Sequence, residues 1–161
     1  MLDAWRSERG GFNDFGQAPD PINREALAKG PLRNERNGLL IVEVVADARP
    51  IGSVSWHREM YGPNPESSVL NFGIELLPDE RGQGYGTEAQ ALLVDLLFET
   101  TPTYRVEAST DIDNIAEQRS LEKLGLHRDG VFRKVQFRAG AYHDLVVYSR
   151  LRDDPEMLAS D

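Results

Sequence analysis

The sequence has no cysteine, which excludes a disulfide framework and any metal site built on thiolates. Its three histidines, His57, His127 and His143, are isolated and lack the H-E-x-x-H spacing that places two ring nitrogens on one helix face, so we expect no metal site. No apolar run approaches the about 20 residues that cross a bilayer, and Met1 is not followed by the basic and then apolar stretch of a secretory signal. These absences favour a cytoplasmic protein that does not contact membranes.

Basic residues are also scarce. The chain has 18 Lys and Arg against 27 Asp and Glu, a net charge of -9. Nucleic-acid binding depends on neutralising phosphates with Lys and Arg, so we expect no nucleic-acid partner. A negative field attracts cationic molecules such as a protonated amine, although the same charge can serve solubility alone.

Apolar residues are spaced in two ways along the chain. Alternating or β-branched segments predict six strands, and apolar residues at helical spacing predict two helices. In chain order these are strands 39–45, 51–60 and 69–77, a helix ending near 98, strand 104–110, helix 114–124, and strands 131–137 and 142–151. The central strand–helix–strand should be a parallel crossover between antiparallel hairpins. The fold class is therefore α/β, with a mixed sheet.

No internal repeat or linker divides the sequence, so we expect one domain over residues 1–161. Its recognisable core covers about 39–151, and residues 152–161 read as a frayed tail. Residues 1–9 look helical, and a second short helix is predicted at 21–29, where a proline occupies an allowed first position.

A glycine-rich run, Arg81-Gly82-Gln83-Gly84-Tyr85-Gly86-Thr87, lies between the third strand and the long helix. Glycines let the backbone turn tightly and approach a ligand closely. The helix that follows begins with unpaired N–H groups and a positive dipole end, which favours anions and above all phosphate. The spacing differs from a Walker A loop, and the third glycine arrives too early for the dinucleotide fingerprint. The alternative is a glycine turn that serves only packing.

The glycine run also matches the pattern R/Q-x-x-G-x-G/A. A second segment opens on Asn114 and ends in Lys-x-Gly at 123–125, with Leu126 where Phe is more common. Together with a Gly-Ile-x-Leu-x-Pro strand before the first motif and the closing hairpin, these features resemble the GNAT superfamily of N-acetyltransferases over about 39–151. The branch that it resembles most includes the ribosomal-protein N-terminal acetyltransferases.

This resemblance implies a GNAT-like fold, in which strand 69–77 splays away from the next parallel strand and the pantetheine arm of acetyl-CoA lies in the gap. The backbone of Ile74 and Leu76 would bond the pantetheine amides, and the side chain of Asn114 would contact the same arm. Acetyl-CoA is the implied acyl donor, without a metal. The implied pyrophosphate site is the glycine run: Arg81, Gly82, Gln83, Gly84, Tyr85, Gly86 and Thr87.

The catalytic positions depart from the family. Where many members have a Tyr that protonates the departing thiolate, this sequence has Leu121. Glu117 stands where the ribosomal branch often has Ser, and it can be an acid with a raised pKa or the partner of Asn114 in a capping box. Glu75 and Glu107 are candidate general bases because each lies on a strand beside the cleft. Either can equally be a structural carboxylate, and an ordered water chain can carry the proton instead.

The implied function is transfer of an acetyl group from acetyl-CoA to a primary amine, of a small molecule or a protein N-terminus, by direct attack on the thioester. The alternative is a non-catalytic acyl-CoA-binding module of the same fold. Either would be a monomer or a homodimer. Four aromatic residues are candidates to line an acceptor pocket, although Trp56 is equally a candidate core residue: Phe12, Phe15, Trp56 and Tyr61.

GNAT domains usually open with a strand and a helix, and residues 2–6 here resemble the end of that helix. We therefore expect the usual first strand and most of the first helix to be absent, so that the sheet begins at the strand near 39–46. One edge or apolar face of the sheet would then be less covered than usual, and a partner chain could cover it.

Overall fold

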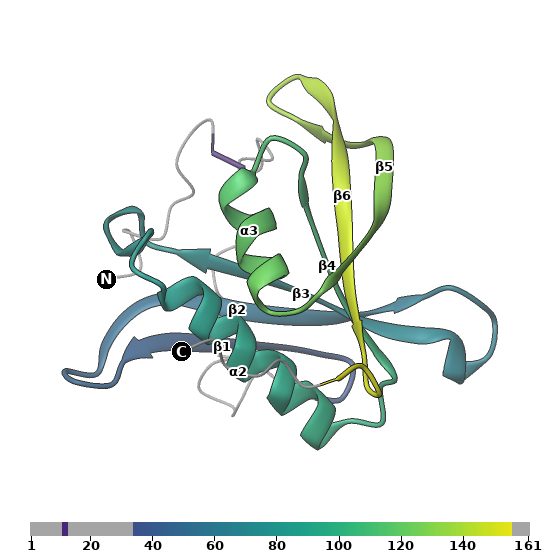
Figure 1. Cartoon of the computed structure of the whole chain (residues 1–161), viewed down its shortest axis with the longest axis horizontal. Coiled ribbons are helices and arrows are strands. Elements are labelled where there is room, and N and C mark those ends of the chain that lie inside the picture. Colours follow the sequence, from purple (N-terminus) through teal and green to yellow (C-terminus); the bar gives the residue numbers. More distant parts are fainter. Residues whose placement is uncertain (1–10, 13–33, 156–161) are drawn as a thin grey trace, which may run out of the picture.

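The computed structural model describes residues 11–12 and 34–155, and these form one six-stranded sheet that carries two α-helices (Figure 1). The sheet has the order β1-β2-β3-β4-β6-β5. Its strands are β1 (Asn37–Val44), β2 (Arg49–Met60), β3 (Ser68–Leu76), β4 (Arg105–Asp111), β5 (His127–Arg138) and β6 (Ala141–Leu151). The helices are α2 (Tyr85–Thr100) and α3 (Ile115–Lys123), and two 3-10 turns are η2 (Pro65–Ser67) and η3 (Pro78–Glu80).

The predicted mixed sheet is confirmed. β1 and β2 form an antiparallel hairpin, as do β5 and β6, while β3 and β4 are parallel and are joined through α2. The parallel pairing is short: it covers Leu70 opposite Val106 and Asn71 opposite Glu107. Beyond these positions the two strands diverge, as Figure 1 shows. The expected splayed pair is therefore present at the centre of the sheet.

Both helices pack on the same face of the sheet. Each side chain at an even-numbered position of β3 and β4 points to that face, because side chains alternate along a strand. Leu93 and Leu97 of α2 and Leu121 of α3 join them in one core cluster. The strand residues of this cluster are Val54, Trp56, Leu70, Phe72, Val106, Ala108, Val146 and Tyr148. The opposite face of β3 and β4 therefore carries the odd-numbered residues, among them the carboxylates of Glu75 and Glu107.

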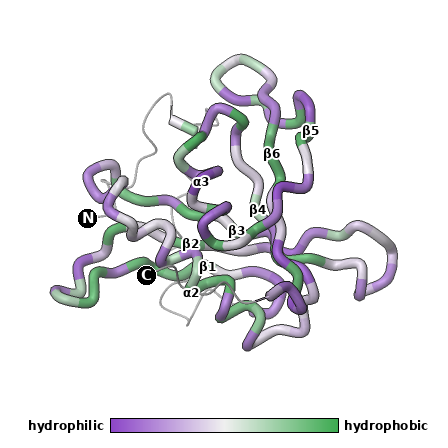
Figure 2. Tube along the Cα trace, in the orientation of Figure 1, coloured by the Kyte–Doolittle hydropathy of each residue, from purple (hydrophilic) through white to green (hydrophobic). Residues whose placement is uncertain are grey.

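The ends of the helices follow local chemistry. Thr100 and Thr101 close α2 by donating their hydroxyls to the carbonyls of Leu96 and Leu97, each at 2.7 Å. Gly125 closes α3 with a φ of 72°, the left-handed conformation that glycine adopts most easily. Figure 2 shows mostly hydrophilic and neutral residues in the connection between β3 and α2, and a mixture of hydrophilic and hydrophobic residues along α2.

Two predicted boundaries were wrong. β5 begins at His127 rather than Val131, because its polar first residues pair with β6 at Ser149 and Tyr148, and such nonlocal pairing outweighs strand propensity. The tail is not frayed at Arg152. Its guanidinium donates to the carbonyls of Phe98, Thr101 and Thr103 at 2.7–2.8 Å, which ties it to the end of α2.

The predicted helices at 1–9 and 21–29, the expected absence of a first strand, and Phe15 all lie outside the described residues. Within residues 11–12 and 34–155, no helix is both long and apolar enough to cross a membrane.

Candidate active site

The glycine run forms a tight turn that ends at the start of α2. Gly82 and Gly84 have φ values of 76° and 91°, and Gly84 is the N-cap of the helix. A Cβ at either glycine would meet no atom within 4 Å, so the backbone conformation requires glycine there while the space beside it is open. No side chain caps the start of α2. The first N–H groups of the helix therefore face this space with the positive end of the helix dipole.

Side chains of the run turn back onto the loop. Arg81 Nε donates to the carbonyl of Leu76 at 3.1 Å, and Gln83 Nε2 donates to the carbonyl of Asp79 at 3.0 Å. A Cβ on Gly86 would lie 3.4 Å from Leu76 Cδ1, so the first turn of α2 packs closely against the end of β3. The run thus brings the start of the helix and the open end of the splayed strands together.

Peptide groups border the gap between β3 and β4. Leu77 N donates to Ile51 O, toward β2, at 2.9 Å. Backbone groups of successive strand residues point to opposite edges, so those of Ile74 and Leu76 point into the gap. Both residues therefore present backbone groups at the border of the gap. On the other side of the gap, Ile112 N donates to the carbonyl of Asp144 in β6 at 3.0 Å. Ser109 is an odd number of residues away from Ile112, so by the same alternation its backbone faces the gap from β4.

Asn114 caps α3. Its Oδ1 accepts from Glu117 N at 3.4 Å and its Nδ2 donates to Thr110 Oγ1 at 3.0 Å. The capping box is only half formed, because Asn114 N donates to the carbonyl of Asp111 at 2.9 Å instead of to the Glu117 carboxylate. Asn114 thus caps α3 through its side chain, while the Glu117 carboxylate is left for other contacts.

Glu117 lies in a polar cluster between the first turns of the two helices. Burial raises its pKa to about 7, and a hydrogen bond with Gln90 offsets part of that effect. Gln90 Nε2 also donates to Ser120 Oγ at 3.3 Å, and Ser120 Oγ lies 2.8 Å from Thr87 Oγ1. A carboxyl with this pKa is protonated about half the time at neutral pH, so it can act as a proton donor.

Leu121 is fully buried in the core cluster. The position where the family often has a tyrosine therefore packs against the sheet and supplies no proton donor.

Glu107 is a buried carboxylate on the face away from the helices. It is 2% exposed and lies at the last parallel pair, opposite Asn71. Its Oε1 accepts from the Tyr61 hydroxyl at 3.1 Å and from Asn71 Nδ2 at 3.3 Å, and its Oε2 accepts from Arg105 at 3.2 Å. Three side chains thus hold one negative charge where the strands begin to separate.

Glu75 lies further along β3, in the splayed half and on the same face as Glu107. It is half-buried, and its carboxylate makes no hydrogen bond or ion pair with another residue of the described ranges. Within these ranges its carboxylate is thus unbonded, whereas three side chains hold that of Glu107.

A third cluster, which sequence reasoning missed, lies at the end of β4. Asp111 forms a buried ion pair with Arg138, and its Oδ2 lies 2.9 Å from His143 Nδ1. Arg138 also donates to the carbonyl of Gly11 at 3.3 Å and lies 5.2 Å from the centre of the Phe12 ring. His143 is one of the three histidines that the sequence shows as isolated. No spacing along the chain signals this contact, because its members come from three separate segments.

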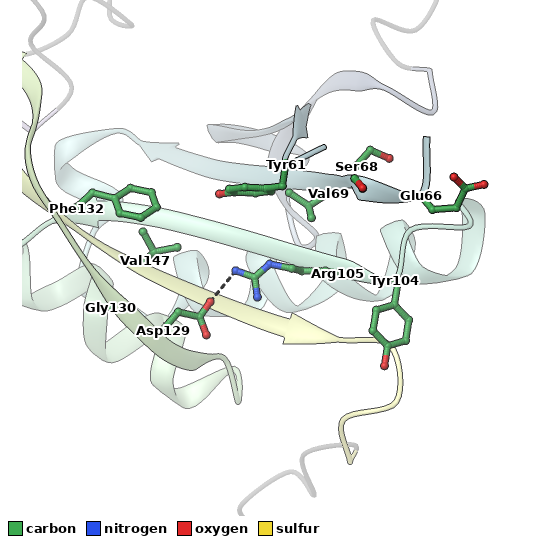
Figure 3. A pocket seen from close by; sticks show the side chains of 11 residues that line it. Tyr61, Glu66, Ser68, Val69, Tyr104, Arg105, Asp129, Gly130, Phe132 and Val147 are labelled. Atoms are coloured by element: carbon green, nitrogen blue, oxygen red, sulfur yellow. Dashed lines mark hydrogen bonds and ion pairs between the residues drawn. The ribbon is translucent and has the colours of Figure 1, made fainter. Parts of the chain in front are cut away.

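A pocket of about 490 Å³ opens on the face away from the helices, beside Glu107 (Figure 3). Tyr61 and Arg105, which both bond Glu107, are part of its wall. Figure 3 shows Phe132 and Val147 at one end and Glu66 and Tyr104 at the other. Of the predicted acceptor-side aromatics, Tyr61 lines this pocket, whereas Trp56 is 5% exposed and belongs to the core. Among the described residues no group of three His, Asp or Glu side chains could hold a metal ion.

Comparison with known proteins agrees with this geometry. A GNAT acetyltransferase domain model matches residues 4–127. "Probable N-acetyltransferase YjcK" of Bacillus subtilis (strain 168) is 33% identical over 111 residues, which are 69% of this chain and 60% of that protein. The chain therefore spans less than two thirds of that relative's length.

Two solved structures share the fold. The ribosomal-protein-S5-alanine acetyltransferase of Vibrio fischeri has a TM-score of 0.67 at 21% identity, covering 83% of this chain and 69% of its own. The microcin C7 self-immunity acetyltransferase MccE, in complex with acetyl-CoA and AMP, has a TM-score of 0.63 at 20% identity, covering 73% of this chain and 62% of its own. With the family model matching well over half of the sequence, the chain belongs to the GNAT family of acetyltransferases, which use acetyl-CoA as donor.

Proposed function

We propose that this protein transfers an acetyl group from acetyl-CoA to a primary amine, of a small molecule or a protein N-terminus, by direct attack of the amine on the thioester. The observation that carries the proposal is the uncapped start of α2, which meets the open end of the β3–β4 gap at two left-handed glycines. These residues fit the coenzyme, because backbone N–H groups at a helix start suit a pyrophosphate.

The proposed binding roles follow from which groups face the gap. The N–H groups of the glycine run would hold the pyrophosphate, with Arg81 and Gln83 at its sides. The backbone of Ile74 and Leu76 would bond the pantetheine arm, because it borders the gap, and the side chain of Asn114 would contact the same arm. When bound there, the coenzyme supplies the thioester whose acetyl group is transferred.

The proposed chemical roles are divided among three carboxylates. The amine must lose a proton before it attacks, and Glu107 is the base that we favour, since it lies at the last paired position of the diverging strands. Glu75, on the same face of the splayed half, is the second candidate. On the helix side, Glu117 would protonate the departing thiolate, because its pKa of about 7 keeps a proton available at neutral pH.

A first experiment tests the function and the base together. Calorimetry measures coenzyme A binding, and release of free thiol from acetyl-CoA is followed across a panel of amines. We expect Glu107→Gln to lower kcat/KM by at least about 100-fold with coenzyme affinity close to wild type. It should also lower the temperature of thermal unfolding, because Arg105 loses one of its two carboxylate partners. Glu43→Gln, a matched change at an exposed position of β1, should leave all three unchanged.

Other outcomes reassign the roles. If Glu75→Gln has the large effect and Glu107→Gln does not, Glu75 is the base. If coenzyme A binds tightly but no amine is acetylated, the protein is an acyl-CoA-binding module and the proposed reaction is wrong.

A further inference from the structure

We propose that the pocket beside Glu107 is the acceptor site, and that it selects a small organic cation whose ammonium group is carried on a flat, apolar body. This inference rests on the proposed function and adds the class of substrate to it. The pocket volume of about 490 Å³ is within the range typical of small-molecule sites.

The walls of the pocket are aromatic and aliphatic. Tyr61, Tyr104 and Phe132 line it although each ring is about half exposed, at 61%, 53% and 47%. Val69 of β3 and Val147 of β6 form its floor. Large exposed rings gathered around one cavity are typical of a surface that binds a ligand, and aromatic walls favour a flat apolar body.

The charge of the pocket favours a cation. Its lining includes two acidic residues, Glu66 and Asp129, and one basic residue, Arg105. The guanidinium of Arg105 already forms ion pairs with two carboxylates, that of Asp129 at 2.6 Å and that of Glu107 at 3.2 Å. The two pocket carboxylates together with Glu107 therefore outnumber the one guanidinium, and a protonated amine is attracted while an anion is repelled.

The pocket also leads to the reacting centre. Glu107 bonds Tyr61 and Arg105 in the pocket wall, and it lies at the last pair before β3 and β4 separate. An ammonium group beside Tyr61 and Arg105 would lie next to the favoured base, Glu107. The apolar body would then lie toward Phe132 and Val147.

The test uses the full chain with three acceptors: tryptamine, the aliphatic diamine cadaverine, and an alanine-initiated tetrapeptide. We expect kcat/KM for tryptamine to exceed that for each of the others by at least about 10-fold, and Phe132→Ala to raise the KM for tryptamine by a similar factor with little change in kcat. The control is Phe137→Ala, on the same strand, whose ring is 58% exposed and outside the pocket lining. It should leave both constants unchanged.

Binding of tryptamine without turnover, measured by calorimetry, separates the two proposals. If tryptamine binds the wild type and not Phe132→Ala, yet no amine is acetylated, the pocket assignment holds and the proposed function fails. The pocket assignment is overturned if acetyl transfer occurs and tryptamine is no better than cadaverine or the peptide. It is also overturned if Phe132→Ala and Phe137→Ala have equal effects.

Discussion

The two sides of the central sheet differ in which atoms form their sites. On the helix side, the start of α2 offers backbone N–H groups at left-handed glycines, and the side chains of Arg81 and Gln83 fold back onto the loop. On the opposite side, the pocket beside Glu107 is made of side chains from several strands, held by hydrogen bonds between residues far apart in sequence. The first site should therefore depend on backbone conformation, and the second on the pairing of charges.

The largest expected effect is on the side-chain face. Asp111→Ala removes the partner of Arg138, whose side chain is 6% exposed, and leaves a buried charge unpaired. We expect the free energy of unfolding to fall by about 3–5 kcal/mol, measured by urea denaturation. The double change Asp111→Ala with Arg138→Met removes the unpaired charge, so it should be more stable than the single variant. A loss below about 1 kcal/mol for Asp111→Ala would show that this ion pair does not hold the face together.

The next effect concerns the backbone site. Gly84→Val places a β-branched residue at a φ of 91°, which the chain can accommodate only by changing the turn. Coenzyme A affinity should fall by at least about 100-fold, or 2.7 kcal/mol, by calorimetry. The double variant Arg81→Glu with Gly84→Val should bind coenzyme A no more tightly than Gly84→Val alone.

Gly140→Val is a matched control. Gly140 has a φ of 81° in the turn between β5 and β6, and a Cβ there also meets no atom within 4 Å. Gly140→Val should destabilise the fold about as much as Gly84→Val does, because both place a Cβ at a positive φ. Its affinity for coenzyme A should stay at the wild-type value. Equal losses of affinity in the two variants would mean that the site has been placed wrongly.

The smallest effect depends on pH. The pKa of Glu117 is about 7 in the folded protein against an ordinary value of 4.5, so the folded state binds this proton more tightly than the unfolded state. Its contribution to stability is present below pH 4.5 and is lost as the pH rises to 7 and above. Glu117→Gln cannot ionise, so it should be close to wild type in stability near pH 4.5 and become the more stable of the two as the pH rises through 7 to 8. Glu99→Gln, at an exposed position of α2, should show no such pH dependence. A constant difference at all pH values would contradict the raised pKa.

The same comparison explains what the sequence could predict. The tight turn of the glycine run at a helix start could be predicted, because glycine spacing reports local backbone conformation directly. Its role as an anion site is part of our proposal. The hydrogen bond from Glu117 N to the Asn114 side chain is likewise local, because it joins residues three apart in the sequence. Glu107 could be placed on a strand beside the cleft, but its contact with Tyr61 could not be foreseen. Asp111 and His143 are likewise brought together only by the β4–β6 pairing, and no periodicity in the sequence encodes that pairing.

The short contact between β3 and β4 has a mechanical consequence. The sheet consists of two antiparallel units, β1-β2-β3 and β4-β6-β5, and in the part of the chain that the structure describes only two backbone residue pairs join β3 to β4. Because few backbone hydrogen bonds connect β3 with β4, the angle between the two units depends mainly on the core packed under α2 and α3. A molecule that formed hydrogen bonds to the peptide groups of both strands would add to this pairing and stabilise the angle between the two units.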